Sequence, residues 1–234
     1  MALVQIAACT LSLSFYSVLA WQVYEHVGSF KSSPQPLNPL VFMSVYFTCA
    51  LQCKYGLMIG DGSIVLANAV GMLVSACGLF AVYFVVGNGN NNNIAILTRA
   101  HMERQMFKFL GAFTVFGFAV YEGWIGEAGV GRTASIVSVA VYIVPVWSVI
   151  TRLRSRDLAR YPQLFEPETR SLSNDCLLAV NTLASVTWAV YGMHLGDPWI
   201  ALPNAFGFLC CLCQVFFMYF RSKRFDLFKL YNLK

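Results

Sequence analysis

Long apolar stretches separated by short polar breaks follow one another along most of the chain. A transmembrane helix needs about 20 consecutive, mostly apolar residues, and seven stretches of this chain meet that requirement. Gly, Asp, Asn and Pro occupy several of the breaks, including 60–62, 87–93, 126–131 and 196–198, where we expect turns or loops. The predicted spans are Val4–Val27, Leu37–Ile59, Ser63–Val86, Phe107–Ile125, Thr133–Arg152, Asp175–Leu195 and Trp199–Phe220.

The composition agrees with a membrane protein. Apolar residues make up 58% of the 234 residues and charged residues 12%, whereas a soluble domain has about 45–50% apolar and about 25% charged residues. This excludes a soluble enzyme, a disordered chain and a nucleic-acid-binding domain. We expect an all-α polytopic membrane protein that lies in a lipid bilayer and has no nucleic-acid partner. No catalytic set is visible, and the cysteine cluster at 210–213 lacks neighbouring His or acidic residues. We therefore expect no enzyme activity, no cofactor and no metal.

The basic residues predict the orientation. All but two of the 16 Lys and Arg residues lie within, or at the edge of, the segments that follow the first, third, fifth or seventh predicted span, the exceptions being Lys54 and Arg132. Positively charged loops stay in the cytosol, so we expect the N-terminus outside and the C-terminus inside. The same bias supports an odd number of spans.

A sequence repeat divides the chain into two similar parts. Residues 55–71 and 191–207 are identical at nine of 17 positions, at a constant offset of 136. A weaker match pairs Ser14 with Pro145, at an offset of 131. Three spans form each repeat and one span is left between them, so the repeats are predicted to be parallel, with a central cavity between them. The predicted organisation is a first repeat at 1–87, a cytosolic loop and linker helix at 88–130, a second repeat at 131–220, and a basic cytosolic tail at 221–234.

Two asparagines hold equivalent positions in the repeats. Asn68 and Asn204 lie inside apolar spans, where an unpaired amide costs roughly 2–7 kcal/mol. Each side chain has two donors and an acceptor, which suit the hydroxyl groups of a sugar. An interhelical clamp is the alternative role, because Asn often joins helices in membranes.

Trp188 and its repeat mate Gln52 are further candidates. An indole ring suits the apolar face of a pyranose, although a tryptophan near a helix end is also typical of the membrane interface. Pro145 removes a backbone hydrogen bond within its span and is predicted to act as a hinge.

The doubled pattern Tyr-Gly-x3-Gly-Asp-x6-Asn-x2-Gly, the segment Trp188-x2-Tyr191-Gly192, Pro145 and the 3+1+3 span count together resemble the SWEET family of sugar uniporters. The resemblance implies bidirectional, facilitated sugar movement by alternating access. It also implies that Asn68 and Asn204 hydrogen-bond a mono- or disaccharide such as glucose while Trp188 stacks on it. Thr48 and Ala184 match positions that shape the pocket, and Gln52 stands where many members have another Trp.

Other functions and locations remain open on the sequence. A PQ-loop-type amino-acid carrier is the main alternative, and a seven-helix receptor is less favoured because the chain is duplicated. We expect the plasma membrane as the location, with an internal membrane such as the Golgi as the alternative. A homo-oligomer is compatible with the sequence but not specified by it.

Overall fold

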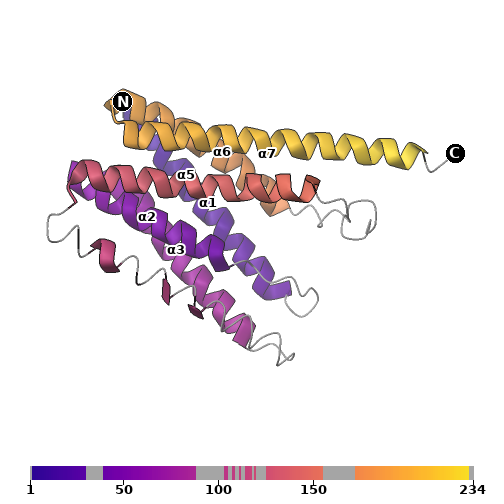
Figure 1. The fold of residues 1–234 in the computed structure, drawn as a ribbon, viewed down its shortest axis with the longest axis horizontal. Helices are drawn as coiled ribbons and strands as arrows, with labels where there is room; N and C mark the ends of the chain where they lie inside the picture. The colour runs from indigo at the N-terminus through magenta and orange to yellow at the C-terminus, as the bar shows by residue number, and fades with distance from the viewer. Residues whose placement is uncertain are drawn as a thin grey trace.

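The computed structural model is described for residues 2–29, 39–87, 125–154 and 172–231 and for part of 103–119, with only the backbone described near several helix ends. These residues form helices and the turns that join them, as Figure 1 shows. Most of the predicted fourth span, Phe107–Ile125, lies outside the described residues. The six helices with defined bounds are α1 (Ala2–Ser29), α2 (Pro39–Ile59), α3 (Gly62–Gly87), α5 (Glu127–Arg154), α6 (Leu172–Leu195) and α7 (Pro198–Tyr231).

The helices form two triplets with the same internal arrangement. In the first triplet (α1–α3), α3 packs against both α1 and α2, and in the second (α5–α7), α7 packs against both α5 and α6. Among the described helices, the most extensive contacts between the triplets are those of α1 with α6 and of α2 with α5, and each is the repeat equivalent of the other. Helices α1, α3, α5 and α7 run in one direction, and α2 and α6 run in the other (Figure 1). The predicted all-α fold of two parallel three-helix repeats is confirmed.

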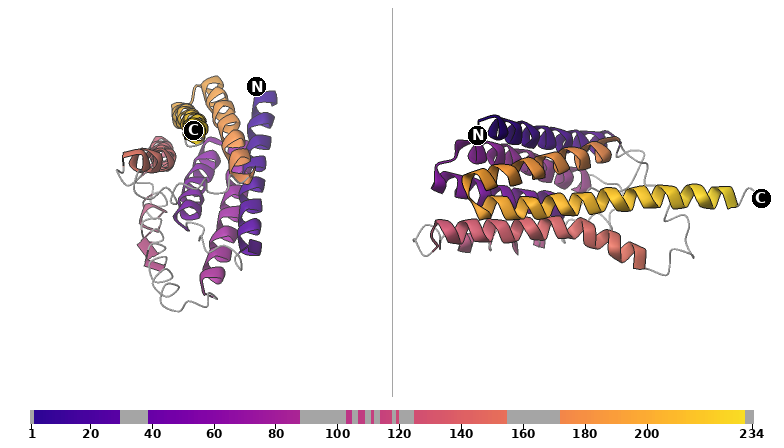
Figure 2. Two further views of the ribbon diagram at one scale, coloured as in Figure 1. Left: turned by 90° about the vertical axis from the view of Figure 1, so that its right-hand side faces the viewer. Right: turned by 90° about the horizontal axis from the view of Figure 1, so that it is seen from above.

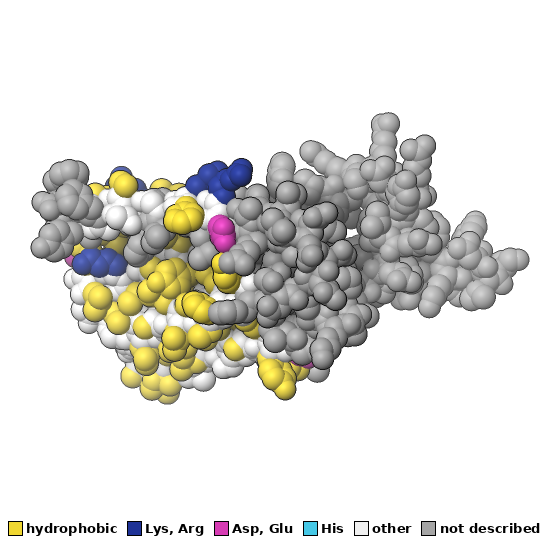
Figure 3. All heavy atoms as spheres, turned by 90° about the horizontal axis from the view of Figure 1, so that it is seen from below, with side chains coloured by type: hydrophobic (Ala, Val, Ile, Leu, Met, Phe, Trp, Pro, Cys, Tyr) yellow, Lys and Arg dark blue, Asp and Glu magenta, His cyan; other side chains and the backbone are white. Residues whose placement is uncertain are grey.

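The outer surface is apolar, as a lipid-facing surface should be. Leu66, Leu73 and Phe80 form an exposed stripe on α3 with a spacing of seven residues, and the repeat equivalents on α7 are also exposed: Leu202, Leu209 and Phe216. Apolar side chains cover much of the described face in Figure 3, with few charged groups among them. Four described helices, α1, α3, α6 and α7, contain segments long and apolar enough to cross a membrane.

The packing corrects the predicted register between the first and fifth spans. Tyr16 lies against Gly71 and its hydroxyl contacts the Cys49 thiol at 3.2 Å, while Tyr142 lies against Gly207 and its hydroxyl contacts Ser185 at 3.3 Å. Because Gly71 and Gly207 are repeat mates, Tyr16 and Tyr142 are mates too, at an offset of 126. The pairing of Ser14 with Pro145 at an offset of 131 was therefore wrong, and Leu19 is the true mate of Pro145.

The second triplet begins earlier than the glycines suggested. We predicted a turn at 126–131 and a repeat boundary at 131, but α5 already begins at Glu127. Gly131 has a packing role within this helix, because a Cβ atom there would lie 2.7 Å from the Tyr55 ring and 2.9 Å from the Trp199 ring. The predicted tail from residue 221 continues α7 as a helix as far as Tyr231.

Pro203 explains a difference between the two triplets. It lies inside α7 and is fully buried, and it removes the backbone hydrogen bond that would reach the carbonyl of Trp199. The Ser135 hydroxyl on α5 donates to that carbonyl at 2.7 Å. Cys9 is the mate of Ser135, and its thiol makes only a 3.5 Å contact with the Ser63 carbonyl, which the helical backbone already satisfies. The Ser135 hydroxyl thus supplies the hydrogen bond that the Trp199 carbonyl loses because Pro203 has no backbone N–H.

Close packing of α6 on α7 gives a test of the fold. A Cβ atom on Gly192 would lie 2.5 Å from the backbone nitrogen of Ala201, whereas its mate Gly56 faces the Ile64 side chain at 2.9 Å. We expect Gly192→Ala to lower the melting temperature in detergent clearly more than Gly56→Ala, since backbone cannot rotate away as a side chain can. Gly62→Ala is the matched control, because nothing lies within 4 Å of its added Cβ. Equal melting temperatures for the Gly192 and Gly62 variants would contradict the packing described here.

Candidate functional site

The repeated Gly-Asp pairs form the turns between α2 and α3 and between α6 and α7. Gly60 and Gly196 have positive φ angles of 74° and 67°, which other residues adopt only with strain. The next residue caps the following helix: Asp61 Oδ1 accepts from the backbone nitrogens of Ser63 and Ile64 at 2.9 and 3.2 Å. Asp197 Oδ1 likewise accepts from the backbone nitrogen of Trp199 at 2.8 Å. The predicted tight turns are therefore present, and we call this end of the bundle the turn end.

The second oxygen of each aspartate joins the two triplets. The Tyr55 hydroxyl on α2 donates to Asp197 Oδ2 at 2.6 Å, and the Tyr191 hydroxyl on α6 donates to Asp61 Oδ2. We call these two bonds the Tyr–Asp latches. They are repeat equivalents of each other, and each connects a tyrosine of one triplet to the turn of the other. Hydrogen bonds to charged groups are worth about 1.5–3 kcal/mol each, so the pair is a substantial brace between the triplets.

A buried cluster closes the turn end behind the latches. It draws side chains from all six helices with defined bounds, and its members are Ala8, Tyr55, Ile64, Ala67, Val130, Trp188, Tyr191 and Ile200. At the opposite end, the described cluster around Leu19 and Phe42 belongs to the first triplet except for Leu177 of α6. The C-terminal ends of α3 and α7 also diverge there (Figures 1 and 2). The triplets are thus held together at the turn end and spread apart away from it.

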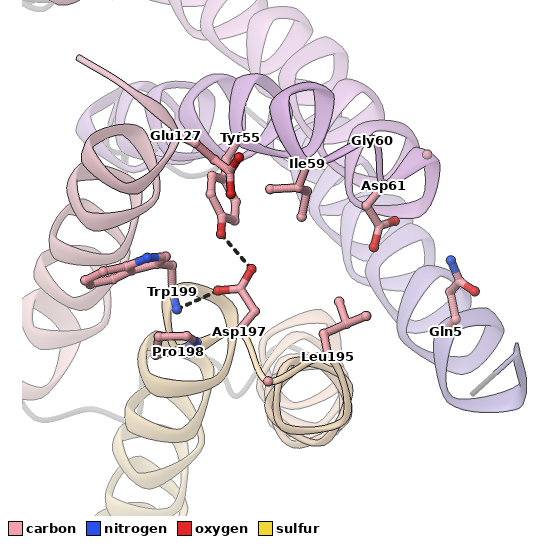
Figure 4. Close-up of a pocket in the computed structure, with 12 residues that line it drawn as sticks. Gln5, Tyr55, Ile59, Gly60, Asp61, Glu127, Leu195, Asp197, Pro198 and Trp199 are labelled. Atoms are coloured by element: carbon pink, nitrogen blue, oxygen red, sulfur yellow. Dashed lines mark hydrogen bonds between the residues drawn. The ribbon is translucent and has the colours of Figure 1, made fainter. Parts of the chain in front are cut away.

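A pocket of about 600 Å³ lies on the outer side of the latches. Both turns and the first residues of α1, α5 and α7 line it, and Figure 4 shows the bond from Tyr55 to Asp197 at its wall. Glu127 from α5 and Gln5 from α1 also face this space (Figure 4). None of the sequence-predicted site residues lines this pocket, which is separate from the predicted central site.

Trp188 lies on the inner side of the latch residues. Its side chain is 9% exposed and packs edge-on against Tyr191, with ring centroids 5.6 Å apart. Its indole Nε1 donates to Ser12 Oγ on α1 at 2.8 Å. The indole therefore sits in the seam between α1 and α6, a position that the sequence did not reveal.

The two asparagines have matching environments. Asn68 Nδ2 donates to the Ile64 carbonyl at 2.8 Å, and Asn204 Nδ2 donates to the Ile200 carbonyl at 2.7 Å. Both acceptors belong to residues of the buried cluster, so each asparagine lies one helical turn further in from the turn end. Both are partly exposed. One amide hydrogen of each is used within its own helix, and the carbonyl oxygen and the other hydrogen have no hydrogen bond to the described residues.

The other predicted pocket residues form a mixed group. Thr48 Oγ1 is buried and has no hydrogen-bond partner among the described residues, although a buried hydroxyl normally has one. Its mate Ala184 is buried, and Gln52 is partly exposed on the same helix as Thr48. Pro145 lies within α5, but its side chain is outside the described ones.

Sequence reasoning missed three features of the site. It identified Asp61 and Asp197 only as turn residues, and it assigned no role to Tyr55, Tyr191 or Ser12. The available signal was the repeated spacing of six residues between Tyr and Asp in both repeats. A polar pair kept in both copies of a repeat indicates a contact, but the spacing alone does not show that the contact crosses between them.

Comparison with known proteins finds similarity to several proteins named as sugar transporters. A family described as "Sugar efflux transporter for intercellular exchange" matches residues 168–224. Sugar transporter SWEET1 of Drosophila pseudoobscura pseudoobscura is 22% identical over 191 residues, which cover 79% of this chain and 74% of the relative. Bidirectional sugar transporter SWEET13 of Arabidopsis thaliana is 26% identical over 205 residues, which cover 82% of this chain and 60% of the relative.

A solved structure shares the fold. The 3.7 Å resolution structure of a eukaryotic SWEET transporter superposes with a TM-score of 0.66 at 18% sequence identity. The match covers 94% of this chain and 99% of the solved chain. The likeness therefore extends over both triplets.

Proposed function

We propose that this chain, a member of the SWEET family, is a bidirectional facilitative sugar transporter that moves mono- or disaccharides such as glucose across a membrane by alternating access. The similar proteins named as sugar transporters support the substrate class. The observation that carries the mechanism is the symmetric closure of one end of the bundle. Two equivalent Tyr–Asp latches and a buried cluster join the triplets at the turn end. The equivalent asparagines lie one helical turn further in than Ile64 and Ile200 of that cluster.

The geometry suits a carrier whose two triplets rock against each other. In the conformation described here, the turn end is closed and the triplets diverge at the other end. Transport in this scheme requires the latches to break while the opposite ends of α3 and α7 come together. Hydrogen bonds are suited to this task because water can replace them on opening at a small net cost, typically about 0.5–3 kcal/mol each.

The sugar site in this proposal lies between the asparagines and Trp188. The free carbonyl oxygen and amide hydrogen of Asn68 and Asn204 pair with sugar hydroxyls, and the Trp188 ring stacks on the sugar ring. Thr48, Gln52 and Ala184 line the remaining wall, and the Thr48 hydroxyl, which has no partner within the described part of the chain, gives it a further hydrogen-bonding group. Pro145 acts as the hinge of α5.

The turn end faces the outside in this proposal. The first turn of α1 lies at that end, since Gln5 Nε2 donates to Ser63 Oγ at 2.6 Å. The C-terminal ends of α5 and α7, which lie away from it, carry Arg152, Arg154, Arg221, Lys223 and Arg224. The positive-inside rule then favours an external N-terminus and a cytosolic C-terminus. The plasma membrane is the proposed location.

Counterflow tests the function directly. Purified full-length protein in liposomes preloaded with unlabelled glucose should accumulate labelled glucose transiently without an ion gradient, because a uniporter exchanges substrate across both faces. A panel that includes sucrose, fructose and several amino acids identifies the substrate class. Liposomes without protein are the control. Exchange of an amino acid with no exchange of any sugar would contradict the proposal and favour an amino-acid carrier.

A further inference from the structure

We propose that Ser12 on α1 is a positioning residue that fixes the orientation of the Trp188 indole for sugar stacking. The inference rests on the proposed function, and in particular on Trp188 as the stacking residue. The contact that carries it is the 2.8 Å hydrogen bond from Trp188 Nε1 to Ser12 Oγ. Both side chains are at least nine-tenths buried, at 8% and 9% exposed.

Ser12 differs from three other Ser and Thr residues of its helix. Thr10, Ser14 and Ser17 each donate to the carbonyl four residues earlier, at 2.8–2.9 Å. Those bonds are local and are common for Ser and Thr inside helices. Ser12 is buried instead, and its oxygen accepts from a side chain 176 residues away in the other triplet. The Ser12 hydroxyl therefore forms its hydrogen bond with the indole of Trp188 and not with the backbone of α1.

The repeat supplies an internal comparison. Ser138 on α5 is the mate of Ser12 in the register of 126 established by Tyr16 and Tyr142, and it is buried to the same degree, at 7% exposed. Its hydroxyl donates to the Ala134 carbonyl of its own helix at 2.8 Å. The mate of Trp188 is Gln52, which is not aromatic. Of these two serines, Ser12 therefore accepts a hydrogen bond from the opposite triplet, where the partner is an indole, and Ser138 bonds to its own helix.

The hydrogen bond restricts how the ring can turn. An indole has one polar atom, and a buried N–H without an acceptor is costly, so the ring keeps the rotamer in which Nε1 meets Ser12. The edge-on contact with Tyr191, at an interplanar angle of 79°, supports the ring from a second side. Together these contacts define which face of the indole is presented to a sugar. Without the hydroxyl, the ring is free to adopt other orientations and stacks less well.

Transport kinetics test this role with three variants in proteoliposomes. Ser12→Ala should raise the KM for glucose counterflow roughly three- to tenfold, as expected for the loss of one hydrogen bond, with a smaller change in the maximal rate. Ser12→Thr keeps the hydroxyl and should restore the KM. Ser138→Ala is the matched control and should leave the KM unchanged, because it removes only a bond within α5. An unchanged KM for Ser12→Ala would overturn the proposal.

A spectroscopic readout separates positioning from general damage. The chain has five tryptophans, and in protein labelled with 5-fluorotryptophan the fluorine resonance lost in Trp188→Phe identifies Trp188. Ser12→Ala should shift that resonance and leave the others in place, whereas Ser138→Ala should not move it. An unmoved Trp188 resonance would also overturn the proposal. If the wild-type protein exchanges no sugar, the proposed function fails as well; if it does, failure in the Ser12 variants concerns the positioning role alone.

Discussion

Replacing Asn204 by alanine is expected to reduce sugar counterflow to a few per cent of the wild-type rate or less while leaving the amount of protein in the membrane unchanged. The free carbonyl oxygen and amide hydrogen of Asn204 are the groups proposed to pair with sugar hydroxyls. Their loss leaves two sugar groups without partners in a closed site, at about 1–3 kcal/mol each, and every 1.4 kcal/mol is a factor of ten. Labelled-glucose counterflow, normalised to reconstituted protein, measures the effect.

Two further variants make the result specific. Asn68→Ala should have a comparable effect, since Asn68 makes the same bond to its own helix and lies at the same depth. Asn181→Ala is the matched control, because Asn181 on α6 donates to the Cys211 thiol of α7 at 3.3 Å within the second triplet. It should retain most of the transport activity. Normal transport by Asn204→Ala at normal abundance would show that the sugar site lies elsewhere.

The repeat in the sequence was sufficient to predict the fold and which residues of the two triplets are equivalent, but not the contacts between the triplets. A shared offset shows which residues are equivalent, and this correctly paired Asn68 with Asn204. Contacts such as that of Tyr55 with Asp197 join residues that are not equivalent. Which residues meet in this way depends on how the two triplets pack against each other, which the repeat does not specify. The bond between Trp188 and Ser12 escaped prediction for the same reason.

The error in register has a clear physical origin. Lipid-facing helices are apolar on most sides, so a short similarity between two of them is a weak guide. The match of Ser14 with Pro145 differed from the true register by five residues, which turns a helix by about 140° and exchanges its packed and lipid-facing sides. The small and hydroxyl residues that pack inward carried the better signal: Ala8 with Ala134 and Ser12 with Ser138 are buried in both triplets.

Removal of both latch hydroxyls should open the turn end. In a Tyr55→Phe/Tyr191→Phe double variant, Asp61 and Asp197 lose their bonds to the opposite triplet but can still cap α3 and α7. Each bond to a carboxylate is worth about 1.5–3 kcal/mol, so the loss of both should shift the balance toward the state open at the turn end by about 100-fold or more. In the open state water can also solvate the Asp61 and Asp197 carboxylates that have lost their tyrosine partners, which favours that state further.

Distances between spin labels at positions 57 and 193 measure this opening. These positions are repeat mates at the turn end, and Leu57 and Met193 are 62% and 65% exposed. Labels attached through p-acetylphenylalanine avoid the eight native cysteines. We expect a longer distance population to dominate in the double variant, with each single variant intermediate. Tyr16→Phe is the matched control, because the Tyr16 hydroxyl contacts Cys49 within the first triplet. The same short distance in the double variant and the wild type would mean that apolar packing alone keeps the turn end closed.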